Sequence, residues 1–79
     1  MSKDLAFEEK LDIRGLDCPV PILRTKSMLA RMTSGDHLNI IANNREFIKE
    51  VHMLSTQLGH TILEEDTEGE ILSFIVQKK

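Results

Sequence analysis

The chain contains one cysteine, Cys18, which stands in the run Asp17-Cys18-Pro19-Val20-Pro21. An alternating, strand-like segment ends just before this run, and a helical pattern begins just after it. Proline is tolerated in the first turn of a helix because the N–H groups there have no partner within the helix. A residue that precedes proline favours extended angles, so we predict that Cys18 caps the helix. The helix dipole favours an anion at that end, and this position therefore suits a sulfur anion.

The chemistry open to Cys18 is limited by what the rest of the chain lacks. A disulfide oxidoreductase resolves its mixed disulfide with a second cysteine, and this chain has none. A cysteine–histidine nucleophile pair is not indicated, because the expected topology places none of His37, His52 and His60 beside Cys18. One cysteine and three scattered histidines also lack the spacing of zinc ligands, so we expect no metal and no cofactor.

The remaining roles for the thiol differ in how much activation they need. The helix dipole is worth only about 0.3–1 kcal/mol to an exposed anion. Arg14 could add to this effect, whereas Asp17 opposes it. Modest activation suits a carrier of the sulfurtransferase type better than a turnover enzyme. The alternatives are a protein-binding or regulatory module in which Cys18 is a small structural hydrophobe and, ranked last, a thiol peroxidase-like enzyme.

Composition narrows the class of protein further. The chain has 79 residues, 41% of them apolar, and a net charge of −3, which predicts one small domain. Residues 34–79 carry eight acidic and four basic side chains, so we expect no direct binding of nucleic acid. The acidic run at residues 64–70 is typical of a solvated hairpin rim. A lone thiol, no signal peptide and no apolar run of about 20 residues predict a cytoplasmic protein without a membrane segment.

Hydrophobic periodicity predicts the order βαβαββ. The expected elements are a strand at 9–14, a helix at 19–32, a strand at 38–42, a helix that Asn43 or Asn44 caps and Gly59 ends, and strands at 60–65 and 71–77 joined by a hairpin turn at 67–69. We therefore expect an α+β fold, a two-layer α/β sandwich with a mixed four-stranded sheet and both helices on one face. The domain would span residues 9–79, after a flexible N-terminal lead-in at 1–8.

The same periodicity predicts which side chains form the core. The buried positions expected in the two helices and the last strand are Ile22, Thr25, Leu29, Met32, Phe47, Val51, Leu54, Leu58, Leu72, Phe74 and Val76. The sheet face away from the helices would stay open to water and to a partner.

The segment around the thiol resembles the TusA/SirA family of small sulfur carriers. The residues that carry the resemblance are Gly15-Leu16-x-Cys18-Pro19-x-Pro21, Lys26, Met32, Gly35-Asp36, Gly59-His60 and Phe74-x-Val76-x-Lys78. The resemblance implies the βαβαββ sandwich. It also implies that the cysteine receives sulfur as a persulfide from a cysteine desulfurase or a rhodanese-like donor and passes it to an acceptor protein. Family members serve tRNA thiolation, cofactor sulfuration or sulfur oxidation.

Carried onto this chain, the resemblance makes Cys18 the persulfide site. The residues expected to shape this site or to dock partner proteins are Arg14, Gly15, Pro19, Pro21, Arg24 and Lys26. Two positions depart from the tRNA-thiolating members. Val20 stands where they often have glutamate, and Asn43-Asn44-Arg45 stands where many members have an acidic pair followed by proline. These departures leave sulfur carriage intact and favour a donor or acceptor outside the tRNA-thiolation relay.

Overall fold

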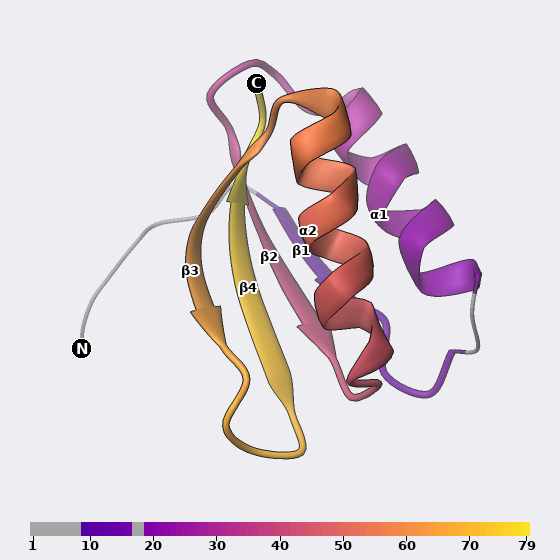
Figure 1. The fold of residues 1–79 in the computed structure, drawn as a ribbon. Coiled ribbons are helices and arrows are strands. Elements are labelled where there is room, and N and C mark those ends of the chain that lie inside the picture. The colour runs from indigo at the N-terminus through magenta and orange to yellow at the C-terminus, as the bar shows by residue number, and fades with distance from the viewer. Residues whose placement is uncertain (1–8, 17–18) are drawn as a thin grey trace.

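The computed structural model describes residues 9–16 and 19–79, and their elements follow the order βαβαββ (Figure 1). The elements are β1 (Glu9–Asp12), α1 (Val20–Arg31), β2 (His37–Ala42), α2 (Glu46–Leu58), β3 (Thr61–Asp66) and β4 (Leu72–Gln77). Each observed boundary lies within a residue or two of the one that periodicity predicts. The lead-in predicted at 1–8 lies outside the described residues.

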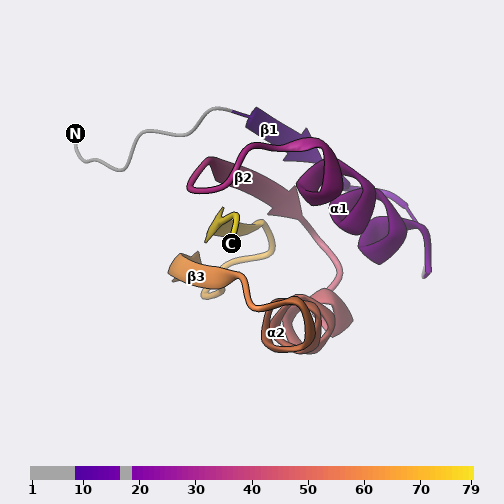
Figure 2. The ribbon, with the colours of Figure 1, turned by 90° about the horizontal axis from the view of Figure 1, so that it is seen from above.

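The four strands form one mixed sheet in the order β1-β2-β4-β3. Strands β1 and β2 are parallel, whereas β4 is antiparallel to both β2 and β3. Both helices pack on the same face of this sheet (Figures 1 and 2). The predicted two-layer α+β sandwich is therefore confirmed. No helix formed by the described residues has the length and apolar character needed to cross a membrane.

The core lies between the sheet and the helices. There the apolar side chains that alternate along the strands pack against those that recur every three or four residues in the helices. Phe47 of α2 and Phe74 of β4 stack edge to face, with ring centroids 5.7 Å apart. Thr25 is fully buried in α1, and its hydroxyl donates to the Pro21 carbonyl at 2.9 Å. A polar side chain is tolerated there because the bond satisfies its donor within the helix.

The predicted burial of Leu58 is wrong, and that of Ile22 is only partial. Leu58 is 41% exposed because it is the last residue of α2, where the helix ends and the chain turns. Gly59 follows with φ of 81°, a left-handed conformation that glycine adopts at low cost. Ile22 is half-buried at the edge of the core. The other predicted helix and strand core positions are buried.

A β-bulge interrupts the pairing of β3 with β4 between Ile62 and Glu64. The extra residue reverses the alternation of side chains, so Glu65 lies opposite the core residue Phe74. Glu65 consequently reaches His52 on α2, whose Nε2 lies 2.7 Å from its Oε1. One carboxylate of the predicted solvated run thus ties the edge strand to a helix.

Candidate functional site

The predicted sulfur site, Cys18, lies with Asp17 outside the described residues, so its surroundings are defined by the chain on either side. We call residues 13–19 the sulfur loop; it leads from the end of β1 into α1. Before the cysteine, Leu16 packs half-buried against the core, and its N–H donates to the Ile13 carbonyl at 3.4 Å. After it, Pro19 is exposed and is the boundary residue just before α1. Both ends of the loop are therefore anchored to the scaffold.

Gly15 forms the turn at the start of the sulfur loop. Its φ of 81° is a left-handed conformation that side chains with a Cβ rarely adopt. Its N–H donates to Oδ1 of Asn43 at 3.1 Å. Asn43 follows the last residue of β2, and because β1 and β2 are parallel, the two strands end at the same edge of the sheet. The loop before Cys18 is therefore fastened to the neighbouring strand end.

Asn44 makes the second contact at this edge. Its Oδ1 accepts from the Glu46 N–H at 2.9 Å, at the first residue of α2. The boundary residue of α2 is Arg45, which makes no side-chain capping bond, so the prediction that an asparagine occupies this position is wrong by one residue. Asn44, one residue earlier, still supplies an acceptor to the first N–H of the helix. Sequence analysis missed the other role, the bond from Asn43 to the sulfur loop. A polar side chain just after a strand that is parallel to β1 was the signal that could have suggested it.

The start of α1 differs by one residue from the prediction. Pro19, rather than Cys18, is the N-terminal boundary residue, with φ of −97° and ψ of 14°. Its carbonyl accepts the first helical bond, from the Leu23 N–H at 3.1 Å. Proline can stand here because it has no N–H to satisfy. Pro21 is buried in the first turn, whereas Leu23 is 57% exposed beside the sulfur loop.

Arg14, in the turn after β1, is paired with the carboxylate of Asp12, the last residue of that strand. Its Nε and Nη2 donate to Oδ1 and Oδ2 of Asp12 at 3.0 and 2.7 Å, a bidentate geometry. The side-chain bonds from Arg14, followed by its backbone N–H, lower the pKa of Asp12 to about 2. The same pairing raises the pKa of Arg14. The guanidinium is thus matched by Asp12, which weakens the expected support from Arg14 to a sulfur anion.

Arg24 and Lys26 lie on opposite flanks of α1, as a spacing of two residues requires in a helix. Arg24 lines a hollow on the β1 side together with Leu11 and Met28. Lys26 lines a groove of about 230 Å³ between α1 and α2, with Met53 of α2 on the other wall. The structure therefore does not bring the two predicted docking residues into one patch. Lys26 alone faces α2.

The histidines are dispersed, as expected. His37 begins β2 and His60 follows the end of α2, whereas the sulfur loop joins the end of β1 to the start of α1. His52 is engaged with Glu65.

The described residues define a small α+β protein, and in its sequence the one cysteine comes directly before Pro19, the boundary residue of α1. The chain belongs to the TusA family, since the family model described as Sulfurtransferase TusA matches residues 9–78. It is 38% identical over 72 residues to the sulfur carrier protein TusA of Allochromatium vinosum, covering 91% of this chain and 95% of that protein. It is also 38% identical over 71 residues to YrkI of Bacillus subtilis, covering 90% and 95% of the two chains. The predicted family membership is confirmed.

A solved structure supports the architecture independently. The crystal structure of a SirA-like protein from Desulfitobacterium hafniense superposes with a TM-score of 0.78. The match covers 89% of this chain and 96% of that one at 18% sequence identity. At this identity the likeness concerns the fold alone.

Proposed function

We propose that this chain is a sulfur carrier and that Cys18 bears the sulfur. In the proposal, Cys18 accepts sulfane sulfur as a persulfide from a cysteine desulfurase or a rhodanese-like donor and passes it to an acceptor protein. The observation that carries the proposal is that the only cysteine in the sequence of a TusA-family chain comes between Gly15, whose N–H is bound to Asn43, and Pro19, the boundary residue of α1. A lone thiol needs a reducing compartment, which makes the cytoplasm the proposed location.

The proposed transfer is a pair of thiol–persulfide exchanges. The Cys18 thiolate attacks the outer sulfur of the donor persulfide, a new S–S bond forms on Cys18, and the donor's S–S bond breaks to release its thiolate. An acceptor thiolate then attacks the outer sulfur on Cys18 and regenerates the free Cys18 thiolate. No net oxidation occurs, because the sulfur keeps its oxidation state. The chain contributes positioning, and the first-turn N–H groups of α1 would favour the anionic outer sulfur.

The acceptor is proposed to lie outside the tRNA-thiolation relay. Asn43 and Asn44 keep their oxygens on backbone N–H groups, as aspartates could, but carry no charge. A partner that recognises an acidic pair at this edge would lose that attraction. We therefore favour an acceptor in cofactor sulfuration or sulfur oxidation.

Mass spectrometry of the intact protein tests the proposal. We expect a mass increase of one sulfur atom after incubation with a cysteine desulfurase and cysteine, or with a rhodanese and thiosulfate. The gain should be absent in Cys18→Ser and should disappear on reduction with dithiothreitol. No sulfur gain from either donor would contradict a carrier role. Failure of iodoacetamide to alkylate Cys18 in the folded protein would favour the binding module with a structural cysteine.

A further inference from the structure

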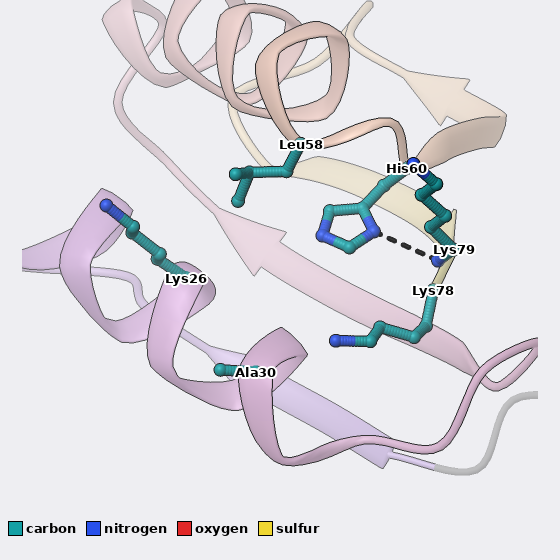
Figure 3. Close-up of a pocket in the computed structure, with 6 residues that line it drawn as sticks. All are labelled: Lys26, Ala30, Leu58, His60, Lys78 and Lys79. Carbon is teal, nitrogen blue, oxygen red and sulfur yellow. Dashed lines mark hydrogen bonds between the residues drawn. The ribbon is translucent and has the colours of Figure 1, made fainter.

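A hollow of about 370 Å³ opens where α1, the end of α2 and the residues after β4 meet (Figure 3). We call it the basic hollow, and its lining residues are Lys26, Ala30, Leu58, His60, Lys78 and Lys79. The lining contains three lysines and no carboxylate side chain, although the chain as a whole carries a net charge of −3. The concentration of positive charge is therefore local.

His60 contributes a neutral hydrogen-bond donor to the basic hollow. The Lys79 N–H donates to Nδ1 of His60 at 3.0 Å, so in the neutral ring the proton is on Nε2. Burial, followed by the charges of Lys78 and Lys79, lowers the pKa of His60 below its ordinary value of 6.5. The ring points into the hollow (Figure 3), which leaves its one N–H, at Nε2, for an occupant.

The three lysines of the basic hollow form none of the ion pairs found between described residues. The ion pairs between described residues join Arg14 to Asp12 and His52 to Glu65 and include none of these lysines. The Lys79 side chain lies against Gly59 at the end of α2, where the helix dipole favours a cation. Lys78 takes part in no ion pair between described residues and leaves its ammonium group to an incoming anion, whereas Lys26 shares its groove with the carboxylate of Glu50.

The basic hollow continues into the groove that runs toward the sulfur loop. Lys26 lines both, and the groove also contains the half-buried Ile22, the exposed Leu23 and Met53, and one carboxylate, that of Glu50. From Ile22 to Ala30 the helix rises about 12 Å. A macromolecule that reaches the sulfur loop along the apolar groove therefore lies over the basic hollow as well. A free inorganic anion would use neither the apolar groove nor the apolar walls of the hollow.

We propose that the basic hollow binds an acidic segment of a protein that exchanges sulfur with this chain, an inference that rests on the proposed function. The partner would place Asp or Glu side chains against Lys26 and Lys78, and its adjacent apolar surface would cover the groove beside Leu23. Docking at these two points orients the partner along α1 toward the sulfur loop. Because exposed charges act mainly during encounter, the contact would raise the rate of association and would weaken with salt.

The binding step can be tested without sulfur transfer, by titrating the isotope-labelled protein with a short polyglutamate peptide at low salt. We expect shifts of the Ala30, Leu58 and His60 amide signals. Lys78→Glu should weaken binding by about tenfold or more. The matched control is Lys10→Glu, which makes the same change of charge on β1 and should alter binding less than about twofold. Equal affinities of the two variants would overturn the proposal.

Two further experiments distinguish an acidic peptide from a free anion as the occupant of the hollow, and distinguish failure of this proposal from failure of the proposed function. If inorganic phosphate shifts the same signals with the affinity of the peptide, the hollow takes isolated anions and the proposal is overturned. In loading assays, Lys78→Glu should slow sulfur transfer from a desulfurase with an acidic docking surface and leave loading from glutathione persulfide unchanged. Equal slowing from both donors would overturn it. Failure of Cys18 to accept sulfur from any donor would instead refute the carrier role, while the peptide titration would still report on the hollow.

Discussion

Replacement of Asn43 by alanine tests whether the strand edge positions the sulfur loop. The change removes the acceptor of the Gly15 N–H, a bond of 3.1 Å between exposed groups. A net hydrogen bond of this kind is worth about 0.5–1 kcal/mol at an exposed site. Because 1.4 kcal/mol is a factor of ten, local opening of the loop should increase about two- to fivefold.

Hydrogen exchange at the Gly15 amide measures this opening, and sulfur loading from a small persulfide donor measures its effect on Cys18. Asn43→Asp keeps an oxygen acceptor and should restore exchange to the wild-type rate. Asn44→Ala is the matched control, because it removes the bond to Glu46 at the start of α2 and leaves the Gly15 bond in place. If Asn43→Ala left exchange at Gly15 and loading of Cys18 unchanged, or if Asn44→Ala changed both equally, the positioning role of Asn43 would be refuted.

Other predictions concern the scaffold and the basic hollow. Gly59→Ala should destabilise the fold by about 1 kcal/mol in urea unfolding, because φ is 81° and the new Cβ would lie 2.8 Å from Cδ of Lys79; unchanged stability would contradict this. Thr25→Val keeps the shape but loses the buried hydroxyl bond, and calorimetry should show a loss of about 0.5–1.5 kcal/mol. His60 should titrate below 6.5 by NMR, and Lys78→Ala should raise its pKa. Since folding lowers the pKa of His60, the unfolded chain binds more protons, and the stability of the fold should decrease as pH drops below 6.5. A midpoint of the His60 titration above 6.5 would contradict this.

The fold was predictable because the chain is short and its apolar spacing leaves one arrangement. The 3.6-residue pattern that includes Leu29 and Phe47 and the 2-residue pattern that includes Phe74 each specify one buried face. Only one sheet face can be covered at this length, so both helices pack there. Periodicity wrongly predicted that Leu58 is buried. The apolar pattern of α2 continues to this residue, but Leu58 is the last residue of the helix and is exposed.

The candidate site was less predictable because its contacts join residues far apart in the chain. The bond from Gly15 to Asn43 requires the parallel register of β1 and β2, which composition does not encode. The gathering of Lys26 with Lys78 requires the position of the chain after β4 relative to α1. By contrast, the pairing of Arg14 with Asp12 joins two exposed side chains only two residues apart, so it is local and was open to prediction.

At the edge of the sheet where β1 and β2 end, backbone geometry and charge are separable properties of this chain. The oxygens of Asn43 and Asn44 accept from backbone N–H groups at 3.1 and 2.9 Å, which an aspartate oxygen could do equally well. The two asparagines therefore preserve the backbone that presents the loop and remove only the charge that an acidic pair would supply. Since rim charge acts on the choice of partner more than on the fold, we expect the neutral edge to change which proteins the chain binds and to leave its backbone unchanged.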